Sequence, residues 1–176
     1  HYAGIRSETT YFVPLGQHFE YWLLRLTNER GVPRRLSVFT YCEFTNQWDT
    51  QQDQVNLQYS LFIVKGEKIH NNLLRIAIQD NLSAQAGASG QSDAGMHCWM
   101  GLTGAPVSRF DTSRQAFLGT YGDYRNPEAV LRGRCSNSAA YGDNACGSYQ
   151  VEIELEPGET RELLVLLGVG DARTTG

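Results

Sequence analysis

Short apolar runs separated by turn residues recur along the chain, and several alternate apolar and polar side chains with a period of two. In residues 35–44, for example, the apolar Leu36 and Val38 lie on either side of the polar Ser37. Runs rich in Val, Ile, Thr and aromatic residues, bounded by Gly, Pro or Asn, are typical of β-strands. The predicted strands are residues 5–13, 19–27, 35–44, 57–65, 73–78, 96–102, 149–155 and 161–167.

Turn residues lie between these strands. The sequence NERGVP at 28–33 predicts an antiparallel hairpin between strands 19–27 and 35–44. Gly66 and Glu67 predict a second turn, and the EPGET sequence at 156–160 predicts a type II turn between the last two strands. The small polar residues 83–95 predict a surface loop.

One short helix is expected at residues 127–132. Pro127 suits a first helical turn, Asn126 suits the N-cap and Gly133 suits the end of the helix. No helix of three turns or more is visible. The pattern therefore predicts an all-β fold, an antiparallel two-layer β-sandwich.

The 176 residues fit one domain, and the chain carries a formal net charge of −4. The 15 basic residues are scattered, which disfavours a nucleic-acid surface. No apolar run has the length of a membrane span, and no signal-peptide pattern begins the chain. Strand-like patterns start almost at once and run nearly to the end, so we expect 1–176 to be a single β-sandwich domain cut from a longer chain.

The four cysteines have no CxxC spacing, which disfavours a zinc site. They are too few for a dense disulfide framework, so free thiols in a reducing compartment are expected. Pairing of Cys135 with Cys146 stays open as the alternative. Of the four histidines, His97 lies beside Cys98 in an apolar run, where a packed histidine is more common than a ligand.

The segment 41–60 concentrates aromatic, amide and acidic side chains after a predicted strand. Flat rings contact the C–H faces of sugars, and amides and carboxylates bond to sugar hydroxyls. The segment therefore suggests carbohydrate binding, and it contains no nucleophile–base pair and no metal-ligand spacing. The side chains in question are Trp48, Asp49, Asp53, Asn56, Gln58 and Tyr59.

Two further interpretations of this segment stay open. If residues 56–59 form a strand, Asn56 and Gln58 share one face, where they either bind a sugar or face water. Asp49 and Asp53 lie near Glu43, but acids on one short loop are more often solvated or capping than catalytic.

Seven motifs in one order resemble the N-terminal β-sandwich of the inverting disaccharide phosphorylases of glycoside hydrolase family 94. That family includes cellobiose, cellobionic acid, cellodextrin, laminaribiose and chitobiose phosphorylases. The resemblance covers about residues 2–170. Its motifs are YFVPL at 11–15, the strand-rich segment 26–44, DQVNLQY at 53–59, FDTSRQAFLG at 110–119, NPEAV at 126–130, GDNACGS at 142–148 and ELEPGETRE at 154–162.

The resemblance implies a two-layer β super-sandwich that is followed in the full protein by a helical linker and a catalytic (α/α)6 barrel. It implies phosphorolysis of a β-linked gluco-disaccharide to α-glucose 1-phosphate and a free acceptor sugar. The family's general-acid Asp lies in the barrel, so no catalytic residue is expected in this chain, and the isolated domain is expected to be inactive. Inorganic phosphate would be the co-substrate, with no metal or organic cofactor.

The resemblance also assigns substrate-binding roles near the acceptor subsite to Asn56, Gln58 and Tyr59. Cellobiose phosphorylases typically have Arg where this chain has Tyr59, which leaves room for acceptors such as gluconate from cellobionic acid or a cellodextrin. Tyr59 would either stack on a sugar ring or pack in the core.

The partners implied are the barrel of the same polypeptide and a second copy in a homodimer, in the cytoplasm, with no nucleic acid or membrane. Two rival functions stay open. One is an autonomous carbohydrate-binding module, and the other is a purely structural dimerisation domain.

Overall fold

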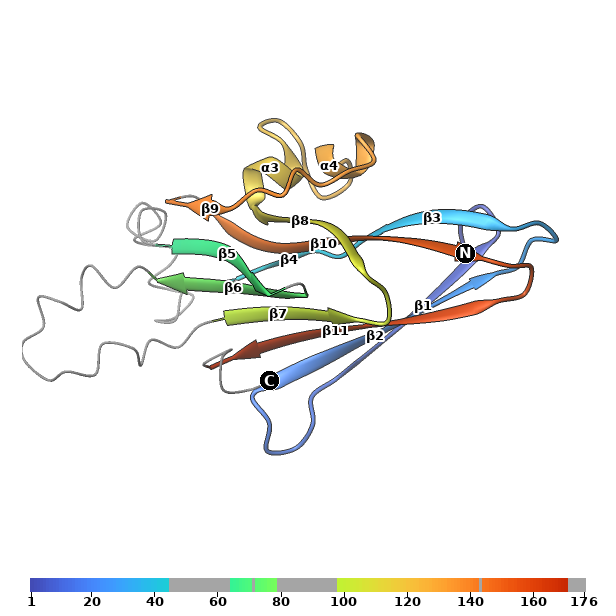
Figure 1. Cartoon of the computed structure of the whole chain (residues 1–176), viewed down its shortest axis with the longest axis horizontal. Helices are drawn as coiled ribbons and strands as arrows, with labels where there is room; N and C mark the ends of the chain where they lie inside the picture. Colours follow the sequence, from blue (N-terminus) through green and yellow to red (C-terminus); the bar gives the residue numbers. More distant parts are fainter. Residues whose placement is uncertain (45–63, 71, 79–97, 143, 171–176) are drawn as a thin grey trace, which may run out of the picture.

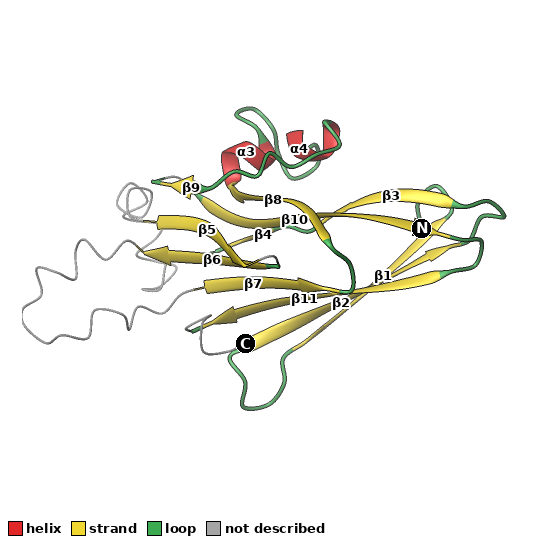
Figure 2. Cartoon of the chain, viewed as in Figure 1, coloured by secondary structure: helices red, strands yellow, loops and turns green. Residues whose placement is uncertain are grey.

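The computed structural model describes residues 1–44, 64–70, 72–78, 98–142 and 144–170. Two antiparallel sheets lie face to face (Figure 1). A short helical segment covers part of the outer face of the smaller sheet (Figure 2). The all-β, antiparallel two-layer architecture predicted from the strand pattern is therefore confirmed.

Within the described ranges the larger sheet has seven strands, in the order β1-β2-β11-β7-β6-β5-β9. They are β1 (Ile5–Phe12), β2 (Phe19–Asn28), β5 (Val64–His70), β6 (Leu73–Ile78), β7 (Cys98–Thr103), β9 (Ala140–Tyr141) and β11 (Thr160–Val169). The last strand of the chain, β11, lies inside the sheet, because it pairs with β2 on one side and β7 on the other.

The smaller sheet is built around one long strand. It contains β3 (Arg34–Phe39), β4 (Cys42–Glu43), β8 (Val107–Ser113) and β10 (Ala145–Leu155). β10 pairs antiparallel with each of the other three.

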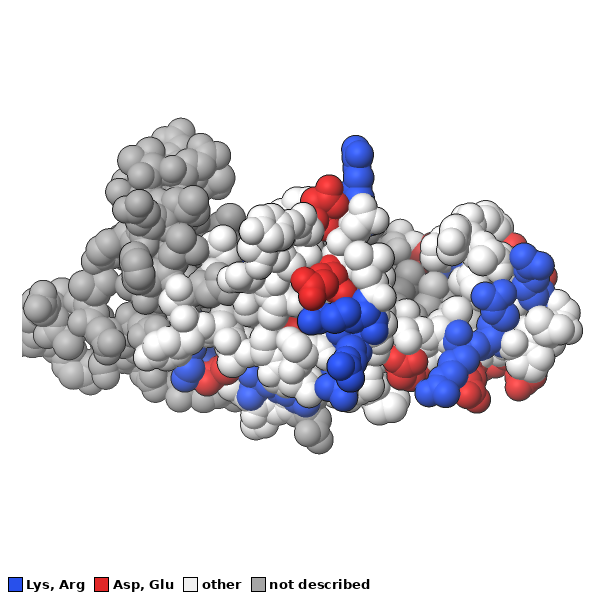
Figure 3. Space-filling view, turned by 90° about the horizontal axis from the view of Figure 1, so that it is seen from above, with Lys and Arg blue, Asp and Glu red and all other residues white. Residues whose placement is uncertain are grey.

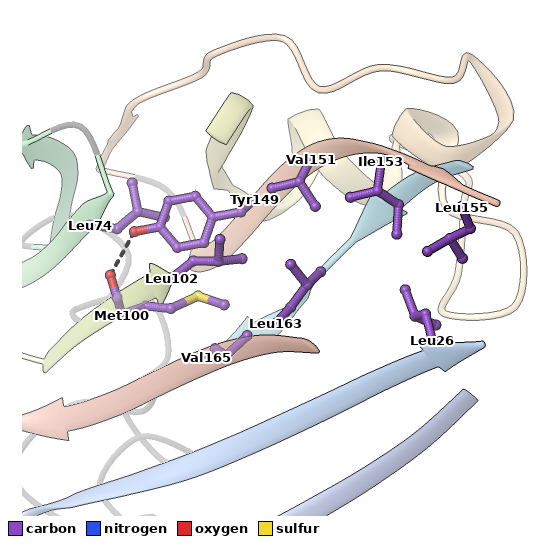
Figure 4. Close-up of a cluster of buried hydrophobic side chains, with 10 residues drawn as sticks. All are labelled: Leu26, Leu74, Met100, Leu102, Tyr149, Val151, Ile153, Leu155, Leu163 and Val165. Atoms are coloured by element: carbon purple, nitrogen blue, oxygen red, sulfur yellow. Dashed lines mark hydrogen bonds between the residues drawn. The ribbon is translucent and has the colours of Figure 1, made fainter. Parts of the chain in front are cut away.

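The main core lies between the two sheets (Figure 4). From β10, Tyr149 and Val151 point inward, while β11 contributes Leu163 and Val165 from the facing sheet. The hydroxyl of Tyr149 donates to the carbonyl of Met100 on β7 at 2.7 Å, so the one polar group of this ring is paired across the layers. The buried members of the cluster are Leu26, Leu74, Met100, Leu102, Tyr149, Val151, Ile153, Leu155, Leu163 and Val165.

Most predicted strands are present with shifted ends, and residues 73–78 coincide with β6. The turn at 156–160 is also confirmed, because Gly158 has a φ of 76° and the N–H of Glu159 donates to the carbonyl of Glu156. The prediction for 57–65 lies outside the described residues except at its end, and the loop 83–95 lies wholly outside them.

The hairpin predicted between residues 19–27 and 35–44 is wrong. β2 pairs with β1 and β11 in the larger sheet, while β3 pairs with β10 in the smaller one. The connection therefore crosses between layers. The buried side chain of Asn28 fixes this corner by donating to the carbonyls of Val32 and Leu155.

The turn predicted at Gly66 and Glu67 is wrong too, because both residues lie inside β5. Gly66 is needed there for close packing: a Cβ on it would lie 2.8 Å from the Cβ of Thr112 on β8. The glycine lets the two sheets approach each other at this point.

Two short helices, α3 (Arg114–Leu118) and α4 (Glu128–Leu131), pack on the outer face of the smaller sheet (Figure 2). The predicted helix at 127–132 is thus confirmed, with Gly133 following it at a φ of 70°. Asn126 as its N-cap is wrong: Pro127 occupies that position, without a side-chain capping bond. The cluster beneath the helices is formed by Phe117, Leu118, Ala129, Cys135 and Cys146.

All four cysteines carry free thiols, so Cys135 and Cys146 are unpaired in this structure. The helices in the described part of the chain are too short and polar to cross a membrane.

Candidate functional site

The residues that the sequence singled out for sugar binding lie outside the described residues. This holds for Asn56, Gln58 and Tyr59 and for Trp48, Asp49 and Asp53. The structure therefore neither brings them together nor separates them. It does describe the strands on either side of this segment.

The residues that flank segments 45–63 and 79–97 meet at one end of the sandwich. Val64 pairs with Ile78, and β7 starts at Cys98, which pairs with Ile76. Phe44, the last residue described before 45–63, packs in the same apolar cluster as Val64 and Cys98. Both segments therefore leave and re-enter the sandwich at this end, next to Glu43.

Glu43 is the centre of a polar cluster at this end, which we call the Glu43 cluster. One carboxylate oxygen, Oε1, accepts hydrogen bonds from the hydroxyl of Tyr41 at 2.6 Å, Nε of Arg114 at 2.7 Å and the hydroxyl of Tyr124 at 2.8 Å. Three donors on one ionised oxygen form charge-assisted bonds, which are stronger than neutral ones.

Aromatic packing holds the donors in place. The ring of Tyr41 stacks on Phe117 of α3 with 4.7 Å between centroids, and the guanidinium of Arg114 lies 5.7 Å from the centroid of Tyr124. Helix α3 begins directly after β8 because Ser113 caps it, accepting from the N–H of Ala116 at 3.2 Å. The cap places Arg114 in the first turn, facing Glu43.

The electrostatics keep this cluster in one protonation state near neutral pH. Partial burial raises the pKa of Glu43, but the hydrogen bonds from Tyr41, Arg114 and Tyr124 outweigh burial and lower the pKa below its ordinary value. Burial and the bond to Glu43 raise the pKa of Tyr41. Glu43 is therefore an ionised acceptor and not a general acid, which fits recognition or positioning better than proton transfer.

A second polar arrangement anchors the chain after α4. Asp111 of β8 is fully buried, and its Oδ1 accepts from the N–H and hydroxyl of Ser136 and from the N–H and hydroxyl of Ser138. Four donors on one buried carboxylate oxygen satisfy its charge inside the fold. Asp111 therefore has a structural role.

The Glu43 cluster was only partly visible in the sequence. In the sequence Glu43 lies near Asp49 and Asp53, but its partners Arg114 and Tyr124 are 71 and 81 residues away along the chain. The FDTSR sequence at 110–114, which positions Arg114, carries no local signal that points to Glu43. Among the residues that the structure describes, no group of three or more His, Cys, Asp or Glu side chains could hold a metal.

Known proteins share this β-sandwich architecture. The whole chain, residues 1–176, matches the family model described as the glycosyl hydrolase 94 supersandwich domain. A solved polysaccharide lyase superposes with a TM-score of 0.50 and 14% identity, covering 96% of this chain and 20% of that one. At this identity the likeness shows the fold alone.

Curated relatives match over nearly the same span. The N,N'-diacetylchitobiose phosphorylase of Vibrio furnissii is 35% identical over 170 residues, which is 96% of this chain and 20% of that protein. Solabiose phosphorylase of Paenibacillus borealis is 28% identical over 180 residues, 99% of this chain and 21% of that protein. From the same organism, 3-O-beta-D-glucopyranosyl-beta-D-glucuronide phosphorylase is 30% identical over 169 residues, 88% and 19% respectively.

The chain thus spans about a fifth of the length of these relatives. The family model covers every residue of it. The chain therefore belongs to the glycosyl hydrolase 94 family, in which it is a supersandwich domain.

Proposed function

We propose that this chain is the supersandwich domain of an inverting disaccharide phosphorylase. The full protein would convert a β-linked gluco-disaccharide and inorganic phosphate to α-glucose 1-phosphate and a released acceptor sugar. The observation that carries the proposal is that the curated relatives above, matched across this domain, are all named as phosphorylases. The acid that protonates the leaving oxygen would lie in a catalytic (α/α)6 barrel of the same polypeptide.

In this proposal the domain shapes the acceptor subsite. The supporting observation is the position of the strand ends around segment 45–63: they lie together at one end of the sandwich, beside the Glu43 cluster. Asn56, Gln58 and Tyr59 belong to that segment, and we propose that they contact the acceptor sugar. The Glu43 cluster would fix β4, the strand that precedes the segment.

The proposal also covers the compartment, oligomeric state and cofactors of the enzyme. The enzyme would be a cytoplasmic homodimer that needs no metal or organic cofactor. The four free thiols support a reducing compartment such as the cytoplasm. Residues 1–176 alone would have no phosphorolytic activity, because the proposal assigns no catalytic group to them.

A substrate panel tests the reaction. The full-length protein is incubated with phosphate and, separately, with N,N'-diacetylchitobiose, solabiose, 3-O-beta-D-glucopyranosyl-beta-D-glucuronide, cellobiose and cellobionic acid. Release of an α-sugar 1-phosphate from one of them is expected and names the acceptor. A folded protein that releases sugar without consuming phosphate would be a hydrolase, and the proposal would be wrong.

A single variant tests the role of the domain. In the full-length enzyme, Gln58→Ala is expected to raise the KM for the acceptor in the synthetic direction, with an unchanged melting temperature. The same substitution at Gln17, outside the proposed subsite, is the control. If KM is unchanged in both variants, the domain has a structural role and not a binding role.

A further inference from the structure

A depression of about 570 Å³ lies on the outer face of the smaller sheet, beside the helical segment and away from the Glu43 cluster. It is lined by side chains from three strands and by the residues that follow α4. Among its lining residues are Arg35, Ser37, Arg109, Arg134, Gln150 and Glu152.

Strand alternation explains why these side chains share one face. Along β10, Val151 and Ile153 point into the core, so Gln150 and Glu152 point outward. The register then brings neighbours to the same surface: Glu152 lies opposite Ser37 on β3, and Gln150 lies opposite Arg109 on β8.

A bulge in β8 adds a hydroxyl to this surface. The register shifts between the pairs Gln150–Arg109 and Val151–Val107, which leaves Ser108 as the extra residue. Ser108 is exposed, lines the depression and donates to the carbonyl of Gln150 at 2.8 Å.

The side chain of Gln150 fixes the wall of the depression. Its Oε1 accepts from the N–H of Cys135 at 2.9 Å, and its Nε2 donates to the carbonyl of Gly133 at 3.1 Å. Gln150, which is only 4% exposed, thus holds the backbone on both sides of Arg134. The two hydrogen bonds of Gln150 therefore fix the position of the Arg134 backbone at the wall of the depression.

The charges here are unbalanced. Six arginines of the described chain lie within 4 Å of a carboxylate, namely Arg6, Arg25, Arg75, Arg114, Arg132 and Arg161, and six do not, three of which line this depression. Arg35, Arg109 and Arg134 form no such pair with the described residues, and all three are exposed. Figure 3 looks onto this face, where Lys and Arg side chains gather at its middle and toward the β3 end, with a few acidic side chains between them.

Glu152 supplies the one carboxylate among the described residues that line the depression. It accepts from the hydroxyl of Ser37 at 2.9 Å and from Nε2 of Gln150 at 2.7 Å. A carboxylate beside three arginines repels a bare anion but accepts hydrogen bonds from hydroxyl groups. The surface is therefore suited to a ligand that carries both kinds of group.

We propose that this depression binds an anionic saccharide, a sugar that bears a phosphate or a carboxylate group. The guanidinium groups of Arg109 and Arg134, with Arg35 opposite, would hold the oxyanion, since guanidinium matches both groups in bidentate geometry. Glu152, Ser37 and Ser108 would bond to the sugar hydroxyls. The volume lies within the range of small-ligand sites. The inference is independent of the proposed reaction, and it assigns a second site on the opposite side of the helical segment from the strand ends.

The test uses the 176-residue chain, which buries its main core between its own sheets. It is titrated with α-glucose 1-phosphate, glucuronate, glucose and inorganic phosphate, and backbone amide shifts and calorimetry are measured. At least one anionic sugar is expected to bind at least tenfold more tightly than glucose and than inorganic phosphate, with shifts at Ser108, Arg134 and Cys135. The tighter of the two anionic sugars identifies the oxyanion.

Two double variants and one single variant sharpen the test. Arg109→Ala with Arg134→Ala is expected to weaken binding at least tenfold, whereas Arg25→Ala with Arg161→Ala removes the same charge elsewhere and leaves binding unchanged. Glu152→Gln is expected to reduce the preference for the sugar phosphate over inorganic phosphate. The proposal is overturned if neither anionic sugar binds, if inorganic phosphate binds equally well, or if the control pair weakens binding as much.

Discussion

The buried carboxylate of Asp111 holds Ser138 by both of its donors, the N–H at 2.9 Å and the hydroxyl at 2.8 Å. The same oxygen accepts both donors of Ser136. The chain that returns from α4 is thereby tied to β8, and this link supports both the helical segment and the wall of the arginine-lined depression.

Asp111→Asn should therefore be strongly destabilising. The amide keeps the shape of the side chain, but it loses the charge that four donors face, and a group left unpaired in the interior costs about 1–3 kcal/mol. We expect a loss of about 3 kcal/mol in the free energy of unfolding, measured by urea denaturation. Asp123→Asn is the matched control, since that carboxylate accepts from the N–H groups of Arg125 and Asn126 in an exposed turn. Similar losses in the two variants would contradict a special role for Asp111.

The Glu43 cluster predicts a dependence of stability on pH. The pKa of Glu43 is lowered in the fold, so its ionised form stabilises the protein above the ordinary pKa of 4.5, and this contribution is lost as the pH falls through the folded value. At pH 7 we expect Glu43→Gln to be less stable than the wild type by about 1 kcal/mol, a small value because the cluster is solvent-accessible.

Urea denaturation at pH 7 and pH 3 measures this effect. The difference between wild type and Glu43→Gln should shrink at pH 3, because this lies below the ordinary pKa of 4.5 and the contribution of the ionised form falls as the pH approaches the lowered folded value. A difference that stays constant between the two pH values would show that the bonds of Glu43 do not depend on its charge. Glu8→Gln is the control, because Glu8 has one ion pair at 4.0 Å and lies on an exposed strand.

Gly168 of β11 leaves room for the indole of Trp99 on β7, with which it is paired across the two strands. A Cβ on Gly168 would lie 2.2 Å from Cζ2 of Trp99, which is closer than two non-bonded carbon atoms can approach. Gly168→Ala should displace the indole and cost about 1–3 kcal/mol, as overpacking does. Gly101→Ala in the neighbouring strand is the control, because its nearest atom, the carbonyl oxygen of Asn72, would be 3.7 Å away.

Urea midpoints and tryptophan emission follow both glycine variants. We expect a lower midpoint and shifted emission for Gly168→Ala only. If the two variants have equal stability, the indole moves aside without cost and the close approach has no energetic importance.

The cysteines should react slowly in the folded protein. Burial raises the pKa of Cys42 and of Cys135 to about 12, and it raises the pKa of Cys146 and Cys98 as well. Because the thiolate is the reactive form, at pH 7.5 we expect thiol titration with an aromatic disulfide reagent to be at least tenfold slower than in denaturant. The denatured protein should yield four thiols, and a yield of two would indicate that one disulfide forms in solution, with Cys135–Cys146 as the pairing that the sequence left open.

The sequence predicted the local parts of this fold best. Residues 73–78 coincide with β6 because short apolar alternation and flanking polar residues define a strand without help from distant residues. β8 was missed because its end is polar: Asp111, Thr112 and Ser113 are buried and hydrogen-bonded, and a pattern based on hydrophobicity does not detect such residues.

Contacts between distant residues could not be predicted in this way. The hairpin prediction between 19–27 and 35–44 is wrong because the two strands pair in different sheets. The corner between them is held by a bond from Asn28 to Leu155, which is 127 residues away. The Glu43 cluster likewise needs Arg114 from another element. The predicted sugar-binding residues Asn56, Gln58 and Tyr59 remain predictions, since they lie outside the described residues.

The interior position of β11 has a consequence for synthesis on the ribosome. β11 pairs with β2 on one side and β7 on the other, and so joins the strands β1 and β2, which are synthesised first, to the rest of the sheet. It also contributes Leu163 and Val165 to the core. The larger sheet can therefore close only after Thr160–Val169 has left the exit tunnel. Until then the strands β1-β2 and β7-β6-β5-β9 form two separate parts of the sheet, each with an unpaired strand edge and an uncovered apolar face. Folding should therefore be late and cooperative, and the nascent chain should need chaperone protection during elongation.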